Sequence, residues 1–373
     1  MLVLIDTTYA RRAPQSGTGI YVERLCAALE AFDGVEVLPA CNVRRRPPAG
    51  GGIGSARNLL ADELWTQIEL PRRARAAGAD LIHHPLPAFA YSCTLPQAVT
   101  VHDLAFEALP DKFDPAFRHV TSRTHRAAAR RARAVICVSH TTAREVQTRW
   151  GVRPERVVVA PHGPGQDLGV HGPGQDLGPG QDFGENEQDP RDVRRQANSQ
   201  GRRSRPYFLY VGDDEPRKNL AALLAAYRCY RERSTAPLEL VLAGSATATD
   251  DGVRVEHAPS AERLAGLYAG AAALVHCSLH EGFGMTLLEA MASGAPVLAA
   301  PAPGVVEVCG DAARYADPGD PDSFATAMAE IAADEALGRD LAARGQRRAA
   351  GFSWTDSARI HLAAYSLAVE HVH

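Results

Sequence analysis

The stretch from His280 to Val297 constrains the fold of this chain more than any other. A short, mostly apolar run over 272–279 precedes it and predicts a buried strand. Helical spacing follows over 285–292, and Gly294 with Pro296 marks the end of that helix. A strand that passes through a tight turn into a helix is the repeating unit of doubly wound domains. We therefore expect an α/β fold with parallel sheets.

The turn between that strand and helix has the residues of an anion site. Gly282 and Gly284 let the backbone approach a ligand without a Cβ in the way. Free N–H groups and the helix dipole then point at one spot. Glu281 and Glu289 lie beside it, and carboxylates suit hydroxyl groups rather than anions. A sugar nucleotide satisfies both requirements, since its diphosphate fits the helix end and its hydroxyls fit the carboxylates.

These residues resemble the Glu-x7-Glu pattern of retaining, nucleotide-sugar-dependent glycosyltransferases of the GT-B fold, and within them the fourth sequence family. The matching positions are Glu281 to Gly284, Leu288 to Ala292, Gly294 and Pro296. The resemblance implies two Rossmann-like domains that face each other across a cleft, with a C-terminal helix that crosses back to the first domain. An ordinary strand–turn–helix with surface glutamates is the plainer alternative.

Composition limits the class of protein. A chain of 373 residues is long enough for two domains. The net charge of −4 gives no general affinity for nucleic acid. No basic leader and no apolar run of about 20 residues is present, so we expect a cytoplasmic protein. Seven cysteines without a Cys-x-x-Cys pair predict free thiols. No metal-ligand spacing is found, and we expect neither a metal nor a cofactor.

The N-terminal residues predict the first strand–loop–helix unit. Leu2 to Asp6 reads as a buried strand, and Gly17, Thr18 and Gly19 form a loop before a helix that ends near Ala31. The third glycine of a dinucleotide fingerprint is missing, which argues against a dehydrogenase. The loop resembles the glycine-rich loop of the glycosyltransferase family, which implies that it faces the donor phosphates. A simple strand–helix turn is the alternative.

Two further strands of this half end in histidine. They cover Asp80 to His84 and Ala98 to His102, and ligands collect at such strand ends in parallel sheets. Together with Trp65, the His102-Asp-Leu sequence resembles the mannosyltransferase-like branch of the family. The resemblance implies that His102 contacts the donor sugar and the acceptor. The alternative is a packed histidine at a strand end.

Arginines dominate the segment from Arg118 to Ala134, which has the composition of a basic helix. Three interpretations stay open: a solvated face, a patch for acceptor phosphates, or peripheral contact with an anionic membrane through Arg118–Arg133. An arginine-rich loop is expected over 44–54.

A repeat interrupts the α/β pattern. His162 to Gly169 recurs as His171 to Gly178, and the whole of 162–205 is nearly free of apolar side chains. Such a segment cannot bury enough surface to offset its chain entropy, so we expect a disordered linker. The predicted divisions are an N-terminal domain (1–161), the linker (162–205), a C-terminal domain (206–352) and a returning helix (353–373).

The C-terminal domain opens with a strand from Tyr207 to Gly212 and continues into Arg217 and Lys218. Two adjacent cations after a strand end suit a diphosphate, whose charge grows as the glycosidic bond breaks. Only Ser245 to Gly252 then separates two strands where the family has a helix, near the expected position of the nucleotide base.

We therefore predict a metal-independent, retaining hexosyltransferase, with Glu281, His102, Arg217 and Lys218 as its catalytic residues. The predicted substrate-binding residues are Gly17, Thr18, Gly19, Gly282, Phe283, Gly284, Met285, Thr286 and Glu289. The donor is GDP-mannose or a UDP-hexose, and the acceptor is a glycan, a lipid-linked glycan or a natural product. Two alternatives remain: a glycoside hydrolase that uses Glu281 and Glu289 as its carboxylate pair, and a non-catalytic subunit that binds nucleotide sugars.

Overall fold

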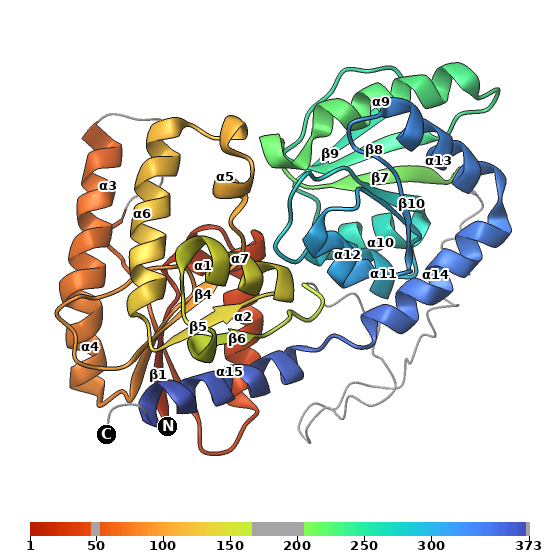
Figure 1. Ribbon diagram of the computed structural model, residues 1–373. Helices are drawn as coiled ribbons and strands as arrows, with labels where there is room; N and C mark the ends of the chain where they lie inside the picture. The colour runs from red at the N-terminus through yellow and green to blue at the C-terminus, as the bar shows by residue number, and fades with distance from the viewer. Residues whose placement is uncertain (46–52, 166–204, 371–373) are drawn as a thin grey trace.

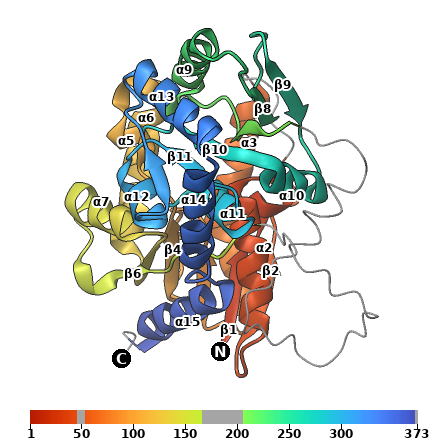
Figure 2. The ribbon, with the colours of Figure 1, turned by 90° about the vertical axis from the view of Figure 1, so that its right-hand side faces the viewer.

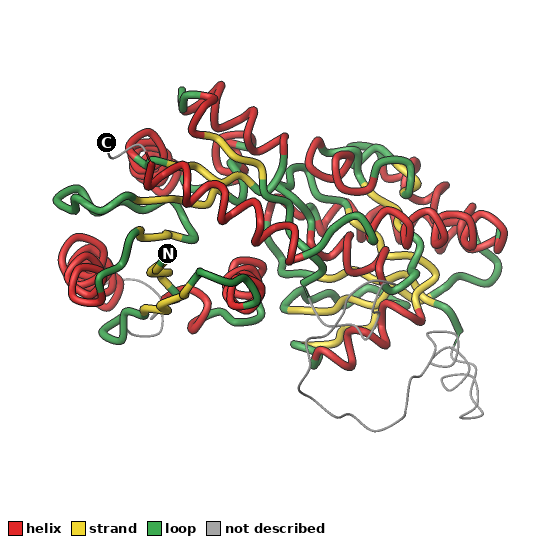
Figure 3. The backbone as a smooth tube through the Cα atoms, turned by 90° about the horizontal axis from the view of Figure 1, so that it is seen from below, coloured by secondary structure: helices red, strands yellow, loops and turns green. Residues whose placement is uncertain are grey.

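A computed structural model describes residues 1–45, 53–165 and 205–370. These residues form two lobes, each built on a parallel sheet with helices on both faces (Figure 1). Within the described residues, each sheet has six strands, in the orders β2-β1-β3-β4-β5-β6 and β12-β11-β10-β7-β8-β9. Seen from below, the strands form two separate groups flanked by helices (Figure 3). This is the GT-B arrangement that the sequence predicted.

The N-terminal lobe contains both the first sheet and the helices that cover it. Its elements are β1 (Leu2–Asp6), α1 (Thr8–Arg12), α2 (Gly17–Glu30), β2 (Glu36–Ala40), α3 (Ile53–Leu64), the π-helical η1 (Trp65–Glu69), α4 (Leu70–Ala77), β3 (Leu81–His84), β4 (Gln97–Val101), α5 (Ala105–Ala108), η2 (Pro110–Lys112), α6 (Pro115–Arg131), β5 (Ala134–Cys137), α7 (His140–Trp150), η3 (Pro154–Arg156) and β6 (Val157–Val159).

The C-terminal lobe repeats the alternation of strands and helices. Its elements are β7 (Tyr207–Val211), the 3-10 turn η4 (Pro216–Lys218), α9 (Leu220–Arg233), β8 (Glu239–Gly244), β9 (Val253–His257), α10 (Ala261–Gly270), β10 (Ala271–His276), α11 (Met285–Ala292), β11 (Val297–Ala299), α12 (Pro303–Cys309), β12 (Ala313–Tyr315), α13 (Pro321–Ala333), α14 (Glu335–Ala349) and the returning α15 (Trp354–Glu370).

The central strands are buried on both faces, as parallel strands between two helical layers must be. Every residue of β4 and of β5 is buried, and two apolar clusters pack against the opposite faces of the first sheet. The second sheet has the same construction, with its own cluster on each face. All parallel strands of one sheet end at the same edge, so the loops that follow them converge there.

The helix α15 joins the two lobes. It follows α14 of the C-terminal lobe and then lies along the N-terminal lobe beside α2 (Figure 2). It also packs against β5. Its residues Ala358, Ala364, Tyr365 and Ala368 are fully buried in the same apolar cluster as Val3 of β1. The returning helix predicted from the family resemblance is therefore present, and it completes the core of the first lobe.

The structure corrects two sequence predictions. Gly17, Thr18 and Gly19 are not a loop; they form the first turn of α2, because Ser16 supplies the N-cap and its side chain accepts from the Gly19 amide. The predicted linker begins too early, since His162 is only 2% exposed and packs against Trp354. Residues 166–204 of that linker and 46–52 of the predicted arginine-rich loop lie outside the described residues.

All seven cysteines are free thiols, and Cys137, Cys277 and Cys309 are buried. In the part of the chain that the structure describes, no helix is both long enough and apolar enough to cross a bilayer.

Candidate functional site

The predicted anion site lies where β10 leads into α11. Gly284 is the N-cap of α11 with φ of 92°, in the left-handed region that glycine adopts without strain. No side chain caps this helix, and within the described residues nothing accepts a hydrogen bond from the amides of Met285 and Thr286. Two free N–H groups at the positive end of a helix dipole form a ready site for an anion.

Glu281 lies in the turn before Gly284 and is kept ionised. Its side chain is 2.8 Å from Nη1 of Arg217 and 3.4 Å from Nε2 of His276. Burial alone would raise the pKa of Glu281, but the charge of Arg217 and the hydrogen bond from His276 hold it well below its usual range. Glu281 is therefore a fixed carboxylate, able to accept hydrogen bonds from a ligand but not to donate a proton.

The two predicted phosphate-binding cations have different environments. Arg217 bridges two carboxylates, because its Nε also lies 2.7 Å from Oε2 of Glu215. Lys218 makes no ion pair among the described residues, and its ammonium lies against the backbone of Gly212, where an added Cβ would be 2.5 Å from Nζ. The sequence prediction treated the two cations alike, whereas the structure leaves Lys218 as the cation available to a ligand.

Glu289 lies on α11, one to two turns from the anion site, in an apolar environment. The Tyr268 hydroxyl donates to it over 2.8 Å, and Gly165 packs so closely on its other oxygen that a Cβ there would be 2.3 Å away. Burial raises its pKa to about 7, although the hydrogen bond from Tyr268 and the charge of Lys218 oppose the shift. The two predicted carboxylates thus have opposite pKa shifts.

The start of α2 faces this site from the N-terminal lobe. A Cβ on Gly17 would be 3.0 Å from the terminal methyl carbon of Met285, so the first turns of α2 and α11 meet across the cleft. Gly19 is required by a different contact, because a Cβ there would lie 2.1 Å from the carbonyl oxygen of Ala13. Thr18 stands half-buried between them.

His102 also meets the donor side. A Cβ on Gly282 would be 1.7 Å from the carbonyl oxygen of His102, so the two backbones are in direct contact. The ring donates from Nε2 to the Pro85 carbonyl over 3.0 Å, which leaves Nδ1 as an acceptor. Burial lowers the pKa of His102, so the ring is a neutral hydrogen-bonding group. The structure therefore brings together His102, Glu281, the α11 N-terminus and the start of α2.

A chain of hydrogen bonds continues from this region through buried side chains. Each hydroxyl and ring can act once as donor and once as acceptor if all rings are neutral. The order is then Tyr365 hydroxyl to His83 Nδ1 (2.8 Å), His83 Nε2 to Thr100 (2.9 Å), Thr100 to Tyr21 (2.8 Å), Tyr21 to His361 Nε2 (2.9 Å) and His361 Nδ1 to the Ser357 carbonyl (2.7 Å). We call these five side chains the histidine–tyrosine chain.

Sequence analysis missed several of these groups. His276 and Tyr268 orient the two carboxylates, and His162 packs between Tyr21 and Phe283, 4.9 and 5.1 Å away between ring centroids. His276 ends β10 as His84 ends β3, so its position at a strand end was the one available signal. Phe283 itself is 5% exposed and packs on Phe352, so it supports the turn.

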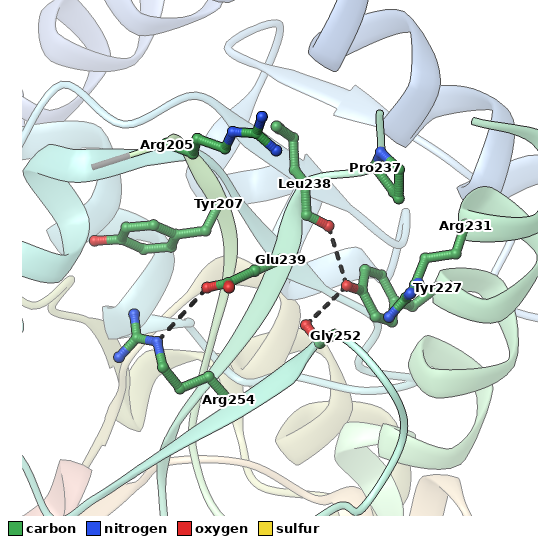
Figure 4. A pocket seen from close by; sticks show the side chains of 9 residues that line it. All are labelled: Arg205, Tyr207, Tyr227, Arg231, Pro237, Leu238, Glu239, Gly252 and Arg254. Carbon is green, nitrogen blue, oxygen red and sulfur yellow. Dashed lines mark hydrogen bonds and ion pairs between the residues drawn. The ribbon is translucent and has the colours of Figure 1, made fainter. Parts of the chain in front are cut away.

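A separate hollow of about 560 Å³ lies at the opposite ends of β7, β8 and β9 (Figure 4). Arg254 is 3.8 Å from Glu239, and the Tyr227 hydroxyl donates to the carbonyls of Leu238 and Gly252. None of the predicted site residues lines it, and its strand ends are those away from the cleft. Elsewhere in the described residues, no group of three or more His, Cys, Asp or Glu side chains is arranged to hold a metal ion.

Two family models match this chain. The model "Glycosyltransferase Family 4" matches residues 15–164, and "Glycosyl transferases group 1" matches residues 192–348. The chain belongs to the group 1 glycosyltransferases. This group 1 glycosyltransferase has curated relatives among mannosyltransferases. It is 35% identical over 175 residues to the O-antigen chain mannosyltransferase B of Escherichia coli, covering 43% of the chain and 46% of the relative.

A second relative is the MMP alpha-(1->4)-mannosyltransferase of Mycolicibacterium hassiacum, 28% identical over 65% of the chain and 56% of the relative. The chain thus spans about half the length of these curated relatives. Solved structures share the fold of this group 1 glycosyltransferase. Sucrose-phosphate synthase from Thermosynechococcus elongatus aligns with a TM-score of 0.73 at 21% identity, covering 98% of both chains. Anabaena HepE in complex with UDP and glucose aligns with a TM-score of 0.69 at 17% identity, covering 98% of this chain and 99% of that one.

Proposed function

We propose that this glycosyltransferase transfers a hexose from a nucleotide diphosphate sugar to a glycan, lipid-linked or natural-product acceptor with retention of configuration. One observation carries the proposal. Glu281, an ionised carboxylate, stands directly before the uncapped N-terminus of α11, and His102 of the other lobe closes over the same turn. A hydroxyl-binding group beside an anion site matches a sugar attached to a diphosphate.

Each residue then has a separate part. The amides of Met285 and Thr286 with Lys218 bind the diphosphate, and Glu281 accepts from a sugar hydroxyl. Glu289 holds the ribose hydroxyls, while Nδ1 of His102 accepts a hydrogen bond from a hydroxyl of the sugar or acceptor. Arg217 keeps Glu281 charged and adds positive potential near the leaving group. The donor can reach Glu289 only after Gly165 moves off its carboxylate.

Retention and independence of metal follow from the same chemistry. Lys218 and the helix end supply positive charge where the diphosphate becomes more negative, which is the work that a divalent ion does in other transferases. No nucleophile is needed if the acceptor hydroxyl attacks on the face that the diphosphate leaves, with the departing phosphate oxygen as base. A chelator such as EDTA should leave transfer unchanged, and anomeric NMR of the product tests retention.

The hydrolase alternative draws on the opposite pKa shifts of Glu281 and Glu289, which resemble an acid–nucleophile pair. Against it, Lys218 and the uncapped α11 amides would then serve no purpose. Two assays distinguish the glycosyltransferase from the hydrolase. One measures transfer from a panel of UDP- and GDP-sugars, and the other measures hydrolysis of aryl glycosides in the absence of nucleotide. Cleavage of the aryl glycosides without a nucleotide would support the hydrolase.

GDP-mannose is the donor that we favour, because both relatives described above are mannosyltransferases and the His102-Asp-Leu sequence resembles that branch. The short Ser245–Gly252 connection between β8 and β9 leaves few groups to recognise a base. Isothermal titration of GDP against UDP tests the assignment. UDP binding tenfold tighter than GDP would exclude GDP-mannose and leave the glycosyltransferase proposal intact.

A peripheral membrane contact through α6 is our proposal for the lipid-linked case. Beside the basic residues Arg123, Arg126 and Arg130, the exposed surface of α6 presents Phe117 and Val120, 52% and 59% exposed. Exposed apolar side chains among arginines suit an anionic interface, at about 1 kcal/mol per arginine. The expected result is binding to vesicles with anionic lipid but not to neutral ones at low salt. Equal partitioning onto both would contradict it.

A further inference from the structure

The N-terminus of α7 is capped by two different side chains. Ser139, its own N-cap, accepts from the Thr142 amide over 3.0 Å. The amides of His140 and Thr141 donate instead to the two carboxylate oxygens of Glu307, over 2.6 and 2.8 Å. A carboxylate at this end of a helix satisfies two otherwise unpaired N–H groups and interacts favourably with the helix dipole.

This second cap crosses from one lobe to the other. The helix α7 belongs to the N-terminal lobe, whereas Glu307 lies on α12 of the C-terminal lobe. The Thr141 hydroxyl adds a third hydrogen bond to Glu307 over 2.9 Å. Val138, just before the helix, is 1% exposed and packs in the apolar cluster of the C-terminal lobe. The start of α7 is therefore docked onto the opposite lobe.

The same short helix α12 supports the turn that carries Glu281. Gly304 lies one turn before Glu307, and a Cβ there would be 2.1 Å from the carbonyl oxygen of Glu281. Glu307 and Gly304 stand three residues apart and thus share a face of α12. The same short helix therefore contacts both the start of α7 and the backbone of Glu281.

The helix α7 touches the other side of that turn. Glu145 lies 3.2 Å from Nε2 of His280, and the Thr142 hydroxyl approaches the Gly282 carbonyl at 3.5 Å. The turn 280–282 is thereby held between α12 and α7. Gly282 of the same turn contacts the backbone of His102.

We propose that Glu307 is a positioning residue whose cap on α7 closes the two lobes and fixes Glu281 against His102. The proposal rests on the proposed function for its catalytic consequence, but lobe closure itself does not depend on the reaction. Glu307 touches no substrate; it acts through α12 and α7.

The kinetic test compares Glu307→Ala with Asp334→Ala. Asp334 also accepts from two backbone amides, those of Ala336 and Leu337, but its helix α14 lies within one lobe. Glu307→Ala should lower kcat about tenfold or more, because a small misplacement of reacting groups is costly, while the KM for the donor changes little. Asp334→Ala should lower the melting temperature without this loss of kcat. Glu307→Gln, which keeps one acceptor oxygen, should lie between wild type and Glu307→Ala.

Small-angle scattering tests closure without any transfer assay. Wild type and both alanine variants are measured alone and with saturating GDP or UDP. Glu307→Ala should have a larger radius of gyration than wild type and Asp334→Ala. Equal radii of gyration under all conditions would overturn the proposed role of the Glu307 cap. A kcat of Glu307→Ala within twofold of that of Asp334→Ala would overturn it as well. If wild type transferred no sugar from any donor, the proposed function would be wrong. The scattering data would still test whether Glu307 closes the two lobes.

Discussion

On the C-terminal side of the cleft, Glu281 stays charged because Arg217 and His276 lie against it; on the N-terminal side, burial lowers the pKa of His83, His102 and His361 and keeps all three neutral. In the proposed function, the first side binds a diphosphate whose charge grows during the reaction, and fixed charges stabilise that growing charge. The second side would bind hydroxyl groups, for which neutral donors and acceptors suffice. Burial favours the neutral form on both sides, and a buried group stays charged only where a counter-charge beside it outweighs that effect.

The largest expected effect on activity comes from removing a charge on the C-terminal side of the site. Lys218→Ala should lower kcat about 100-fold or more, because it removes the cation that we propose stabilises the developing diphosphate charge. Lys112→Ala, which changes the chain's other lysine, is the matched control and should leave transfer in solution unchanged. A Lys218→Ala enzyme within threefold of wild type would remove Lys218 from the site.

The next largest effect comes from the protonation of Glu289 on the same side. The raised pKa of Glu289, about 7, means that its carboxylate is mostly protonated at pH 6 and mostly ionised at pH 8. An ionised carboxylate is the stronger acceptor for ribose hydroxyls, so the binding of GDP or UDP should tighten about tenfold over this range. Isothermal titration calorimetry measures nucleotide binding to wild type and to Glu289→Gln at both pH values. The comparison separates the protonation of Glu289 from that of the nucleotide, which is the same for both proteins. The same pH dependence in both proteins would contradict the assignment.

The smaller effect tests the neutral side. Burial lowers the pKa of His361 to about 4, below its unfolded value of 6.5. Its contribution to stability is therefore present above pH 6.5 and is lost as the pH falls toward 4. Between pH 7 and pH 5 the loss should be about 2 kcal/mol of the free energy of unfolding. Protonation also breaks the histidine–tyrosine chain, since Nε2 of His361 can then no longer accept from Tyr21.

Urea unfolding at the two pH values measures this loss. His361→Gln should weaken the protein at pH 7 but reduce its pH dependence, whereas the exposed His119→Gln should change neither. A pH dependence that survives His361→Gln in full would place the titrating group elsewhere.

Local pattern predicted the strand–turn–helix units of the two sheets, and the family resemblance predicted their GT-B arrangement. The α11 helix was expected over the residues that it occupies, because Gly284, Gly294 and Pro296 mark its ends. The family resemblance is confirmed by the two family models. The partners of each charge could not be predicted, since Arg217 meets Glu281, and Tyr268 meets Glu289, only after the chain folds. Long-range contacts such as Glu307 with α7 leave no trace in local spacing.

Gly17 to Gly19 show a subtler limit. Glycines commonly indicate a loop, and Ser16 was not recognised as an N-cap, so the start of α2 was placed too late. Gly19 is instead a packing requirement, imposed by the Ala13 carbonyl. The π-helical turn at Trp65–Glu69 lies between the α-helices α3 and α4, and periodicity does not reveal such a local change of winding.

The return of α15 sets the order in which this chain can fold. Tyr21 and His361 are hydrogen-bonded although 340 positions separate them, so the first lobe lacks part of its interior until the ribosome has passed residue 370. Contacts of such long range are slow to form, and the incomplete lobe exposes apolar surface meanwhile. A fragment comprising residues 1–165 should therefore be digested by proteases far faster than the same residues within the whole chain. Adding a synthetic 354–370 peptide should slow its digestion, and a fragment that is already resistant alone would show that the lobe matures without its last helix.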